Sequence, residues 1–565
     1  MAEGQPELAK ICMLYAPHPA LLSRRKPVIL TAIILATLII GGTGLLVLSL
    51  YLASPSAGMT WSVVSSSQTW AVIIGAGGQS FLSASLSILL GLMAARSLHR
   101  RGQFFGRGVF LSLSFMAMIV PTTVAAIGLV QLWGRNGFLR HLIDTLFGRE
   151  LLFPAYGLEM VILAHILFNA PLVMRVGLEA LSGLPDHHWR LSAQFGFSRL
   201  AYFRFVEWPC LKMLIPTLFS LIFLLCFTSF SLVLMLGGGP GVSTLEVAIY
   251  TSVRFDFNLP KAAVLSALQL IIAGGFILLL SRGRLPSWTN RLSMASKILR
   301  TDVQSVSGKL ADSLILGCFC LIVLCPLLAL FLSVRLAEGV SLFERPAFWQ
   351  AFWSSTCLGT STAVLSTTLA FILCAGRHRM SGQSFGARLG RAVVSLSQSV
   401  YLVLPAIVLG TASFLVFRPV VNLFDHVIFV VLLSNSLLAL PFAARLIDGR
   451  YHMITPAQDK LCAQLGLTGL RRVFWVTLPA MKREIGLCLG LTAALSIGDF
   501  GVIALFGSEQ FQTLPYLLYQ YSSRYGGAEA ELLAVFLLIY GFGLFFFLNQ
   551  TVNWLALRRV HAESH

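Results

Sequence analysis

Long apolar runs alternate with short polar segments along almost the whole chain. A helix needs about 20 apolar residues to cross the hydrocarbon core of a bilayer, and the runs are of that order. They lie near residues 28–52, 73–94, 109–132, 158–176, 215–236, 262–280, 313–334, 352–375, 393–417, 427–443, 485–506 and 532–548. The pattern predicts an all-α polytopic membrane protein with about twelve transmembrane helices, six in each of two halves.

Basic residues cluster in every second polar segment, which places the clusters on one side of the predicted membrane. Lysine and arginine collect in cytoplasmic loops, so the basic clusters place both termini in the cytoplasm. We predict a cytoplasmic tail at 1–27, a first half at 28–280 (core about 77–280), a cytoplasmic linker at 281–312, a second half at 313–548 (core about 352–548) and a cytoplasmic tail at 549–565.

One phrase occurs twice. Residues 191–209 read LSAQFGFSRLAYFRFVEWP and residues 461–479 read LCAQLGLTGLRRVFWVTLP; we call them the first and second repeat. Seven residues of the first, Leu191, Ala193, Gln194, Gly196, Leu200, Val206 and Pro209, return 270 positions later as Leu461, Ala463, Gln464, Gly466, Leu470, Val476 and Pro479. The shared register indicates a duplicated module.

Both repeats are basic, amphipathic islands between apolar runs. We interpret each as a short helix, a break at glycine and a second short helix along the membrane surface, because glycine accepts positive φ at a helix end. The alternative is a basic loop that follows the charge rule for cytoplasmic segments. That alternative explains the arginines, but not the glycine and the proline at one fixed interval in both repeats.

Composition supports the membrane assignment and limits the kinds of partner that the chain is expected to bind. Apolar residues make up 56% of the 565 residues and charged residues 11%, against about 25% charged in an ordinary globular chain. In a soluble protein the net charge of +18 would suggest nucleic-acid binding. Here the basic residues lie in short loops between apolar runs, where they orient the chain in the membrane. We therefore expect lipid around the chain and no nucleic acid. The ten cysteines show no CxxC pair, so we expect no metal site and no structural disulfide.

Polar residues inside the predicted spans are candidates for lining a translocation pathway. They are Gln79, His165, Asn169, Asn435 and Asp499. Intramembrane acids are rare and are functional by default, which singles out Asp499. The alternative for Asp499 is capping of a broken helix between Gly498 and Gly501. The alternative for the others is hydrogen bonding between helices.

The repeats resemble the EAA loop of ABC importer permeases at the glycine and at the proline thirteen residues later. The resemblance departs at the Glu-Ala-Ala triplet, replaced by Arg190-Leu191-Ser192 and Lys460-Leu461-Cys462, so nothing matches the glutamate contact. It implies that each repeat carries a coupling helix that enters a groove of the ATP-hydrolysing subunit. The residues assigned to these helices are Ala193, Gln194, Gly196, Pro209, Ala463, Gln464, Gly466 and Pro479.

Four further stretches are similar to the thiamine ABC transporter permeases of Gram-negative bacteria. They are FRFVEWP at 203–209, LGGGP at 236–240, SIGDFGVIALFG at 496–507 and TLPYLLYQ at 513–520. The resemblance implies a type I importer permease in the bacterial inner membrane, with both halves on one chain. It also implies two copies of an ABC ATPase, a periplasmic thiamine-binding protein, and thiamine with its phosphates as substrate.

The chain lacks GxxxxGK[ST], because Gly308-Lys309 has neither the upstream glycine nor the following Ser or Thr. We expect no enzyme activity and no cofactor on this chain, with ATP and Mg held by the partner ATPase. Two other functions stay open: a fused permease for ferric iron or another small solute, and a secondary transporter driven by an ion gradient. A membrane enzyme is remote, since no paired carboxylates or nucleophile–base arrangement appears.

Overall fold

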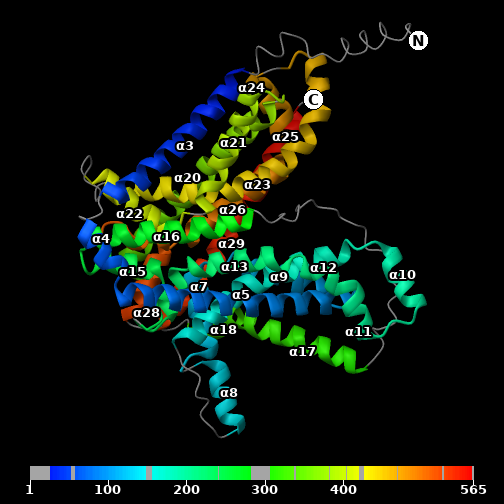
Figure 1. Cartoon of the computed structure of the whole chain (residues 1–565), viewed down its shortest axis with the longest axis vertical. Helices are drawn as coiled ribbons and strands as arrows, with labels where there is room; N and C mark the ends of the chain where they lie inside the picture. Colours follow the sequence, from blue (N-terminus) through cyan, green and yellow to red (C-terminus); the bar gives the residue numbers. More distant parts are fainter. Residues whose placement is uncertain are drawn as a thin grey trace.

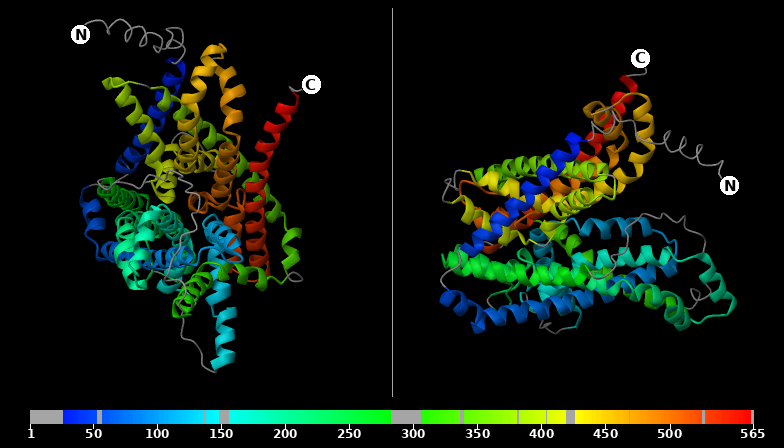
Figure 2. Two further views of the ribbon diagram at one scale, coloured as in Figure 1. Left: turned by 90° about the vertical axis from the view of Figure 1, so that its right-hand side faces the viewer. Right: turned by 45° about the horizontal axis from the view of Figure 1, so that its top comes forward.

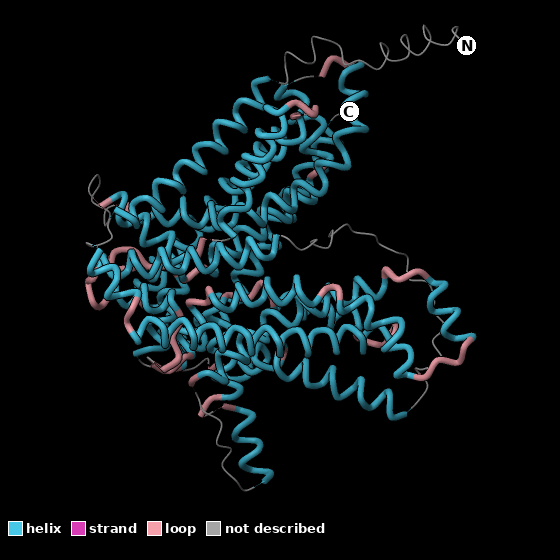
Figure 3. The backbone as a smooth tube through the Cα atoms, viewed as in Figure 1, coloured by secondary structure: helices cyan, strands magenta, loops and turns pink. Residues whose placement is uncertain are grey.

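The computed structural model describes most of the chain, and every regular element in the described residues is helical (Figure 3). The description covers residues 26–562 apart from 53–56, 136, 148–155, 240, 282–305, 336–338, 381, 403, 419–425, 468 and 525–526. The all-α prediction is therefore confirmed for this part of the chain. Most of the expected tail at 1–27 and most of the expected linker at 281–312 lie outside the described residues.

The first half contains the helices up to residue 281. They are α3 (Lys26–Leu52), α4 (Ala57–Val64), α5 (Ser67–Arg101), α6 (Arg107–Ala117), α7 (Thr122–Trp133), α8 (Phe138–Phe147), α9 (Leu158–Ser182), α10 (Asp186–Gln194), α11 (Arg199–Tyr202), a π-helical turn (Phe203–Glu207), α12 (Trp208–Lys212), α13 (Ile215–Phe227), α14 (Ser231–Leu236), α15 (Leu245–Arg254) and α16 (Leu259–Ser281).

The second half repeats this order with small changes. Its elements are α17 (Val306–Val323), α18 (Cys325–Ser333), a 3₁₀ turn (Val340–Glu344), α20 (Pro346–Arg379), α21 (Phe385–Ser399), a 3₁₀ turn (Val400–Leu402), α22 (Ala406–Phe417), α23 (Val427–Gln464), α24 (Gly469–Arg472), a π-helical turn (Val473–Thr477), α25 (Leu478–Ala480), α26 (Lys482–Gly498), α27 (Gly501–Phe506), α28 (Leu514–Arg524) and α29 (Ala528–Ala562). α17 begins inside the expected linker, and α29 continues through most of the expected C-terminal tail.

Nine helices of the described chain are long and apolar enough to cross a membrane, and twelve if each sharply bent pair is one span. Two runs that the sequence predicts as unbroken spans, 109–132 and 393–417, are sharply bent. α6 and α7 meet at 115°, and the helices on either side of Pro405 meet at 105°. Pro121 and Pro405 each have extended ψ and stand at the start of the next helix. Proline disfavours helical conformation in the residue before it, so the first helix ends there.

The first helix of each half packs on the other half. α3 contacts α20, α21 and α22 of the second half, and α17 contacts α5 and α9 of the first. The α3–α20 contact is close, because a Cβ atom on Gly376 would lie 2.1 Å from the Cβ of Ala32. Small residues let helix backbones approach in a lipid environment, where apolar burial alone does not drive association. The two halves are therefore interlocked.

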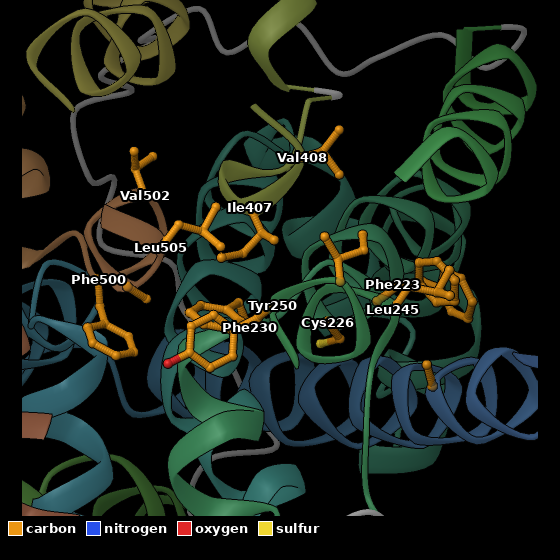
Figure 4. Close-up of a cluster of buried hydrophobic side chains, with 14 of the residues drawn as sticks. Phe223, Cys226, Phe230, Leu245, Tyr250, Ile407, Val408, Phe500, Val502 and Leu505 are labelled. Atoms are coloured by element: carbon orange, nitrogen blue, oxygen red, sulfur yellow. The ribbon is translucent and has the colours of Figure 1, made fainter. Parts of the chain in front are cut away.

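The helices form two arms that converge at one end and diverge at the other (Figures 1 and 2). α10, α11 and α12 of the first half lie at the free end of one arm, and α24 and α25 of the second half lie at the free end of the other (Figure 1). α4, α15 and α28 lie where the arms converge. A continuous apolar core joins the halves there and includes Phe230, Ile407 and Phe500 (Figure 4).

Candidate functional site

The first repeat contains a helix that ends in a Schellman motif. Gly196 follows α10 in the left-handed conformation, with φ of +62°. The N–H of Phe197 donates to the carbonyl of Ser192 at 3.0 Å, and the N–H of Gly196 donates to the carbonyl of Ala193 at 3.1 Å. These bonds satisfy carbonyls that a helix end leaves free. Glycine is favoured because a residue with a Cβ atom is strained at this φ.

The second repeat has the same break. Gly466 has φ of +65°, and the N–H of Leu467 donates to the carbonyl of Cys462 at 2.9 Å. The predicted break at glycine is thus present in both repeats. The predicted short helix before it is wrong for the second repeat, where α23 runs unbroken to Gln464. In the first half, Gly183 and Pro185 lie between α9 and α10. The corresponding residues of the second half are Met453 and Thr455, and neither forces a helix to end.

One π-helical turn precedes the proline in each repeat. The turns span Phe203–Glu207 and Val473–Thr477, and Pro209 and Pro479 are each the second residue of the helix that follows. Proline lacks an N–H, and its ring clashes with the carbonyl four residues earlier, which lies inside the turn. A wider turn accommodates that carbonyl, and such turns often mark functional sites. The fixed glycine–proline interval therefore specifies one backbone geometry twice.

Large apolar side chains on both repeats are exposed. They are Leu191, Phe195, Leu200 and Phe205 in the first repeat, and Leu461, Leu465, Phe474 and Trp475 in the second. Phe195 is 75% exposed and Trp475 is 63% exposed. Exposed apolar patches of this kind mark protein interaction sites. The two repeats thus present corresponding apolar patches at the free ends of the two arms (Figure 1).

The remaining residues predicted for the coupling helices lie on or beside these patches. Gln194 and Gln464 are exposed, while Ala193, Pro209 and Pro479 are partly buried. Ala463 lies in α23, but its side chain is outside the described part of the structure. Sequence reasoning missed the anchor of this element, Trp189, which is buried against His99 and Tyr202 with ring centroids 5.0 Å and 6.3 Å away.

An ion pair that the sequence analysis also missed fixes the first repeat to α5. Glu207 is fully buried in the π-helical turn, and the Nε of Arg96 donates to its Oε2 at 2.5 Å. The Arg96 guanidinium also lies 4.9 Å from the ring centroid of Phe203. The second repeat has Thr477 at the place of Glu207, so the two attachments differ. The available signal was one acidic residue within an otherwise basic and apolar repeat.

A second buried acid connects the halves near the first repeat. Asp312 of α17 lies 3.3 Å from Arg100 of α5 and 3.7 Å from Arg199 at the start of α11. The sequence analysis placed Asp312 in the linker, whereas it is buried in the helix interface. In the second half, Asp448 of α23 forms an ion pair with Arg377 of α20. Charged contacts therefore hold the first repeat to α5 and α17, and in the second half an ion pair joins α20 to α23, the helix that runs into the second repeat.

Four of the polar residues proposed for the pathway are buried, and three of them join helices. His165 Nδ1 lies 3.0 Å from the Ser83 hydroxyl, which connects α9 to α5. Asn435 donates to the Ser496 hydroxyl at 3.1 Å, which connects α23 to α26, and Asn169 donates to the Sγ of Cys226 at 3.6 Å, which connects α9 to α13. Gln79 is buried on α5. These bonds agree with the alternative reading of interhelical hydrogen bonding; a role in the pathway stays a prediction.

Asp499 lies at the break between α26 and α27. Its Oδ1 accepts from the N–H of Gly501 at 3.2 Å, as the capping alternative predicts, while its buried Oδ2 has no hydrogen-bond partner among the described residues. Two other helices start beside this break. A Cβ on Gly498 would lie 3.3 Å from Pro121, and a Cβ on Gly501 would lie 2.6 Å from the Cβ of Ala406. Helix N-termini carry partial positive charge, which suits a carboxylate there.

A second carboxyl group, which the sequence analysis did not single out, lies near Asp499. Glu246 of α15 is buried and accepts from Gln269 Nε2 at 3.3 Å. α15 is not among the candidate spans. Burial raises the pKa of the Glu246 carboxyl well above its ordinary value; the Gln269 bond opposes this shift, and the nearby Asp499 charge adds to it. The protonated form of Glu246 is therefore favoured.

Two phenylalanines from equivalent positions meet between the halves. Phe230 precedes α14, and Phe500, 270 positions later, precedes α27. Their ring centroids are 5.7 Å apart and their planes differ by 13°. Because the two residues correspond in the duplication, their contact lies on the pseudo-twofold axis that relates the halves. Broken helices at the interface of repeats are typical of transport sites.

The comparisons with known proteins agree with this architecture. Residues 87–290 match the family described as binding-protein-dependent transport system inner membrane component. The chain is 35% identical to the thiamine transport system permease protein ThiP of Escherichia coli (strain K12), over 85% of this chain and 88% of that protein. It is also 35% identical to ThiP of Salmonella typhimurium, over 93% of this chain and 97% of that protein. The chain belongs to the thiamine transport system permease family.

Membership of this family makes the chain a multi-pass permease of the inner membrane, as predicted. The ferric iron alternative is not favoured. A ferric transport system permease protein, FbpB of Actinobacillus pleuropneumoniae, is 25% identical over 41% of this chain and 33% of that protein. The thiamine permeases match over most of both chains, and the ferric permease matches over a minor part.

Proposed function

We propose that this permease is the membrane subunit of an ATP-driven importer that moves thiamine and its phosphates from a periplasmic binding protein into the cytoplasm. The observation that carries the proposal is the pair of repeats. Both present the same glycine break, the same π-helical turn and an exposed apolar face at the free ends of the two arms. The assignment of thiamine as the substrate rests on the extent of the similarity to the thiamine transport system permeases.

Two copies of one ATPase suit two equivalent docking surfaces. The basic repeats favour the cytoplasmic side for these surfaces and for both termini. The exposed aromatic residues, above all Phe195 and Trp475, would fill a groove in each ATPase. ATP and Mg would then be bound by the ATPase chains.

A direct mechanical path connects each repeat to the centre of the molecule. In the first half, the chain leaves Pro209 through α12 and α13 and reaches Phe230; in the second, it leaves Pro479 through α25 and α26 and reaches Phe500. Each phenylalanine follows its repeat glycine by the same 34 positions (230 − 196 and 500 − 466). Closure of the ATPase dimer would draw the two repeats together. The movement would pass along α13 and α26 and shift Phe230 and Phe500, just past the ends of these helices, relative to each other.

The arrangement of the arms suits the state that faces the cytoplasm. The arms diverge at the repeats and converge around α15 and α28 (Figure 1). In that state the path would be closed on the periplasmic side, where the binding protein delivers its substrate. ATP-driven approach of the arms would open this side, which is alternating access between two pseudo-equivalent halves.

The experiment is uptake of labelled thiamine in cells that lack the gene, with the gene restored in the presence or absence of the ATPase gene. Restoration only when the ATPase is also present supports the proposal. Uptake that persists without the ATPase and stops when the ion gradient is collapsed would instead identify a secondary transporter. ATPase co-purification without thiamine uptake would retain the importer and overturn the substrate.

A further inference from the structure

Four aromatic rings meet where the two halves converge. Phe230 stacks on Phe500 across the pseudo-twofold axis. Tyr250 of α15 lies 5.2 Å from Phe230, and Tyr519 of α28 lies 5.0 Å from Phe500, measured between ring centroids. We call these four residues the axial aromatic cluster. Figure 4 shows Phe500, from the second half, beside Phe230 and Tyr250, from the first.

The axial aromatic cluster is packed between the halves, and three of its four rings are almost completely buried. Phe500 is 1% exposed, and Phe230 and Tyr250 are each 4% exposed. Each half supplies two of the four rings, so the central stack exists only while the halves are in contact at this level. Any rotation that separates the halves here separates Phe230 from Phe500. Two flat faces, one from each half, would then become available at the same time.

Asp499 is adjacent in sequence to this cluster, and the buried Glu246 is a second acid near it. Asp499 is the residue before Phe500, its Oδ2 has no hydrogen-bond partner among the described residues, and it takes part in no ion pair among them. Its counterpart before Phe230 is Ser229, so the duplication carries the acid on one side only. A carboxylate next to paired aromatic faces is the chemistry that recognises a flat organic cation.

We propose that the axial aromatic cluster and Asp499 form a transient site for the thiazolium ring of thiamine during its passage between the halves. Phe230 and Phe500 take the cationic ring between their faces, and the Asp499 carboxylate supplies the opposite charge. This inference rests on the proposed function, because thiamine carries a permanent positive charge on that ring. When the halves close again, the two phenylalanines restack and expel the ring.

The interaction energies of the proposed site suit a substrate that binds only in passing. A cation gains free energy against an aromatic face, and restacking of the two rings recovers a similar amount when the substrate leaves. The two contributions are similar, so the substrate is held without being trapped. The carboxylate lowers the barrier for a cation that must leave water, and its hydrogen bond to Gly501 keeps it at the helix break.

The test is the rate of labelled thiamine uptake by the complete importer, with the same binding protein and ATPase throughout. Asp499→Asn removes the charge and keeps the shape, and Asp499→Glu keeps the charge. Phe500→Leu removes the aromatic face, and Phe500→Tyr keeps it. We expect at least a tenfold loss for Asp499→Asn and Phe500→Leu, and substantial recovery for Asp499→Glu and Phe500→Tyr. Phe348→Leu is the matched control, because Phe348 is a fully buried ring in a different core cluster.

The outcomes separate this site from the importer function. Wild-type importer that fails to take up thiamine overturns the proposed substrate and, with it, this site. Wild-type uptake with unchanged rates in Asp499→Asn and Phe500→Leu overturns the site alone. Equal losses in the conservative and the non-conservative variants, or an equal loss in Phe348→Leu, would show that packing is responsible and also overturn the site. The amount of each variant that purifies with the ATPase reports its folding.

Discussion

Replacement of Gly466 tests whether the second repeat transmits force to its ATPase. A Cβ built on Gly466 meets nothing within 4 Å, so alanine there changes only the backbone preference. At φ of +65° this change costs roughly 1–2 kcal/mol, which lowers the fraction of correctly formed repeat about 5- to 30-fold if that conformation is marginal. Proline cannot adopt this φ at all, since its ring holds φ near −65°.

Proline at 466 also disturbs the bond from the Leu467 N–H to the Cys462 carbonyl, because that bond depends on the left-handed glycine between them. We expect Gly466→Pro to abolish thiamine uptake while the protein still inserts in the membrane, since the substitution lies outside every candidate span. Gly466→Ala should reduce uptake partially. The repeat is exposed, so global stability should change little in either variant.

The assay compares three quantities for each variant: the amount in the membrane, the amount of ATPase that purifies with it, and thiamine uptake. Gly386→Ala is the matched control. Gly386 lies in α21, and a Cβ there also meets nothing within 4 Å, but its φ is that of a helix. The control should keep full uptake and gain a few tenths of a kcal/mol in helix stability. Wild-type uptake by Gly466→Pro would refute the coupling role of the second repeat.

Four further substitutions test the packing and the buried charges. Arg96→Ala should lower the free energy of unfolding by on the order of 3 kcal/mol, because it removes the partner of the buried Glu207. Glu207→Thr should lower it by less, because the Arg96 that it leaves unpaired reaches water. Equal shifts in melting temperature for the two variants would contradict this reasoning. Gly376→Leu should lower the melting temperature through a clash with Ala32 worth roughly 1–3 kcal/mol, and an unchanged transition would show that α3 packs elsewhere. Glu246→Gln should retain uptake, because burial favours the neutral acid; a large loss would indicate a charged Glu246.

Several features could be predicted from local sequence, and the reason is the same in each case. The apolar runs report spans because lipid offers no hydrogen bonds to an exposed backbone. The glycine at 196 and its copy at 466 report a left-handed helix end, because few other residues accept that φ. The duplication showed that the glycine and the proline belong to both copies of the repeated module. The similarity to thiamine permeases indicated the family.

Other local features were misread because their outcome depends on neighbours. The runs at 109–132 and 393–417 were predicted as continuous spans, but at Pro121 and Pro405 the chain changes direction by more than 100°. Pro171 lies inside the continuous helix α9 without ending it. Proline has the same intrinsic chemistry in each place, and packing decides whether the helix continues. The same holds for α23, which runs through a region where the equivalent residues of the first half break.

The amino-acid sequence by itself determined the membrane class, the two-half organisation and the paired repeats, since these depend on composition, on period and on backbone preferences of single residues. Only the tertiary structure decided which residues meet. The pairing of Arg96 with Glu207 and the stacking of Phe230 on Phe500 join positions more than 100 residues apart. Such contacts follow from how interlocked halves pack, and packing is a property of the whole chain that no local stretch encodes.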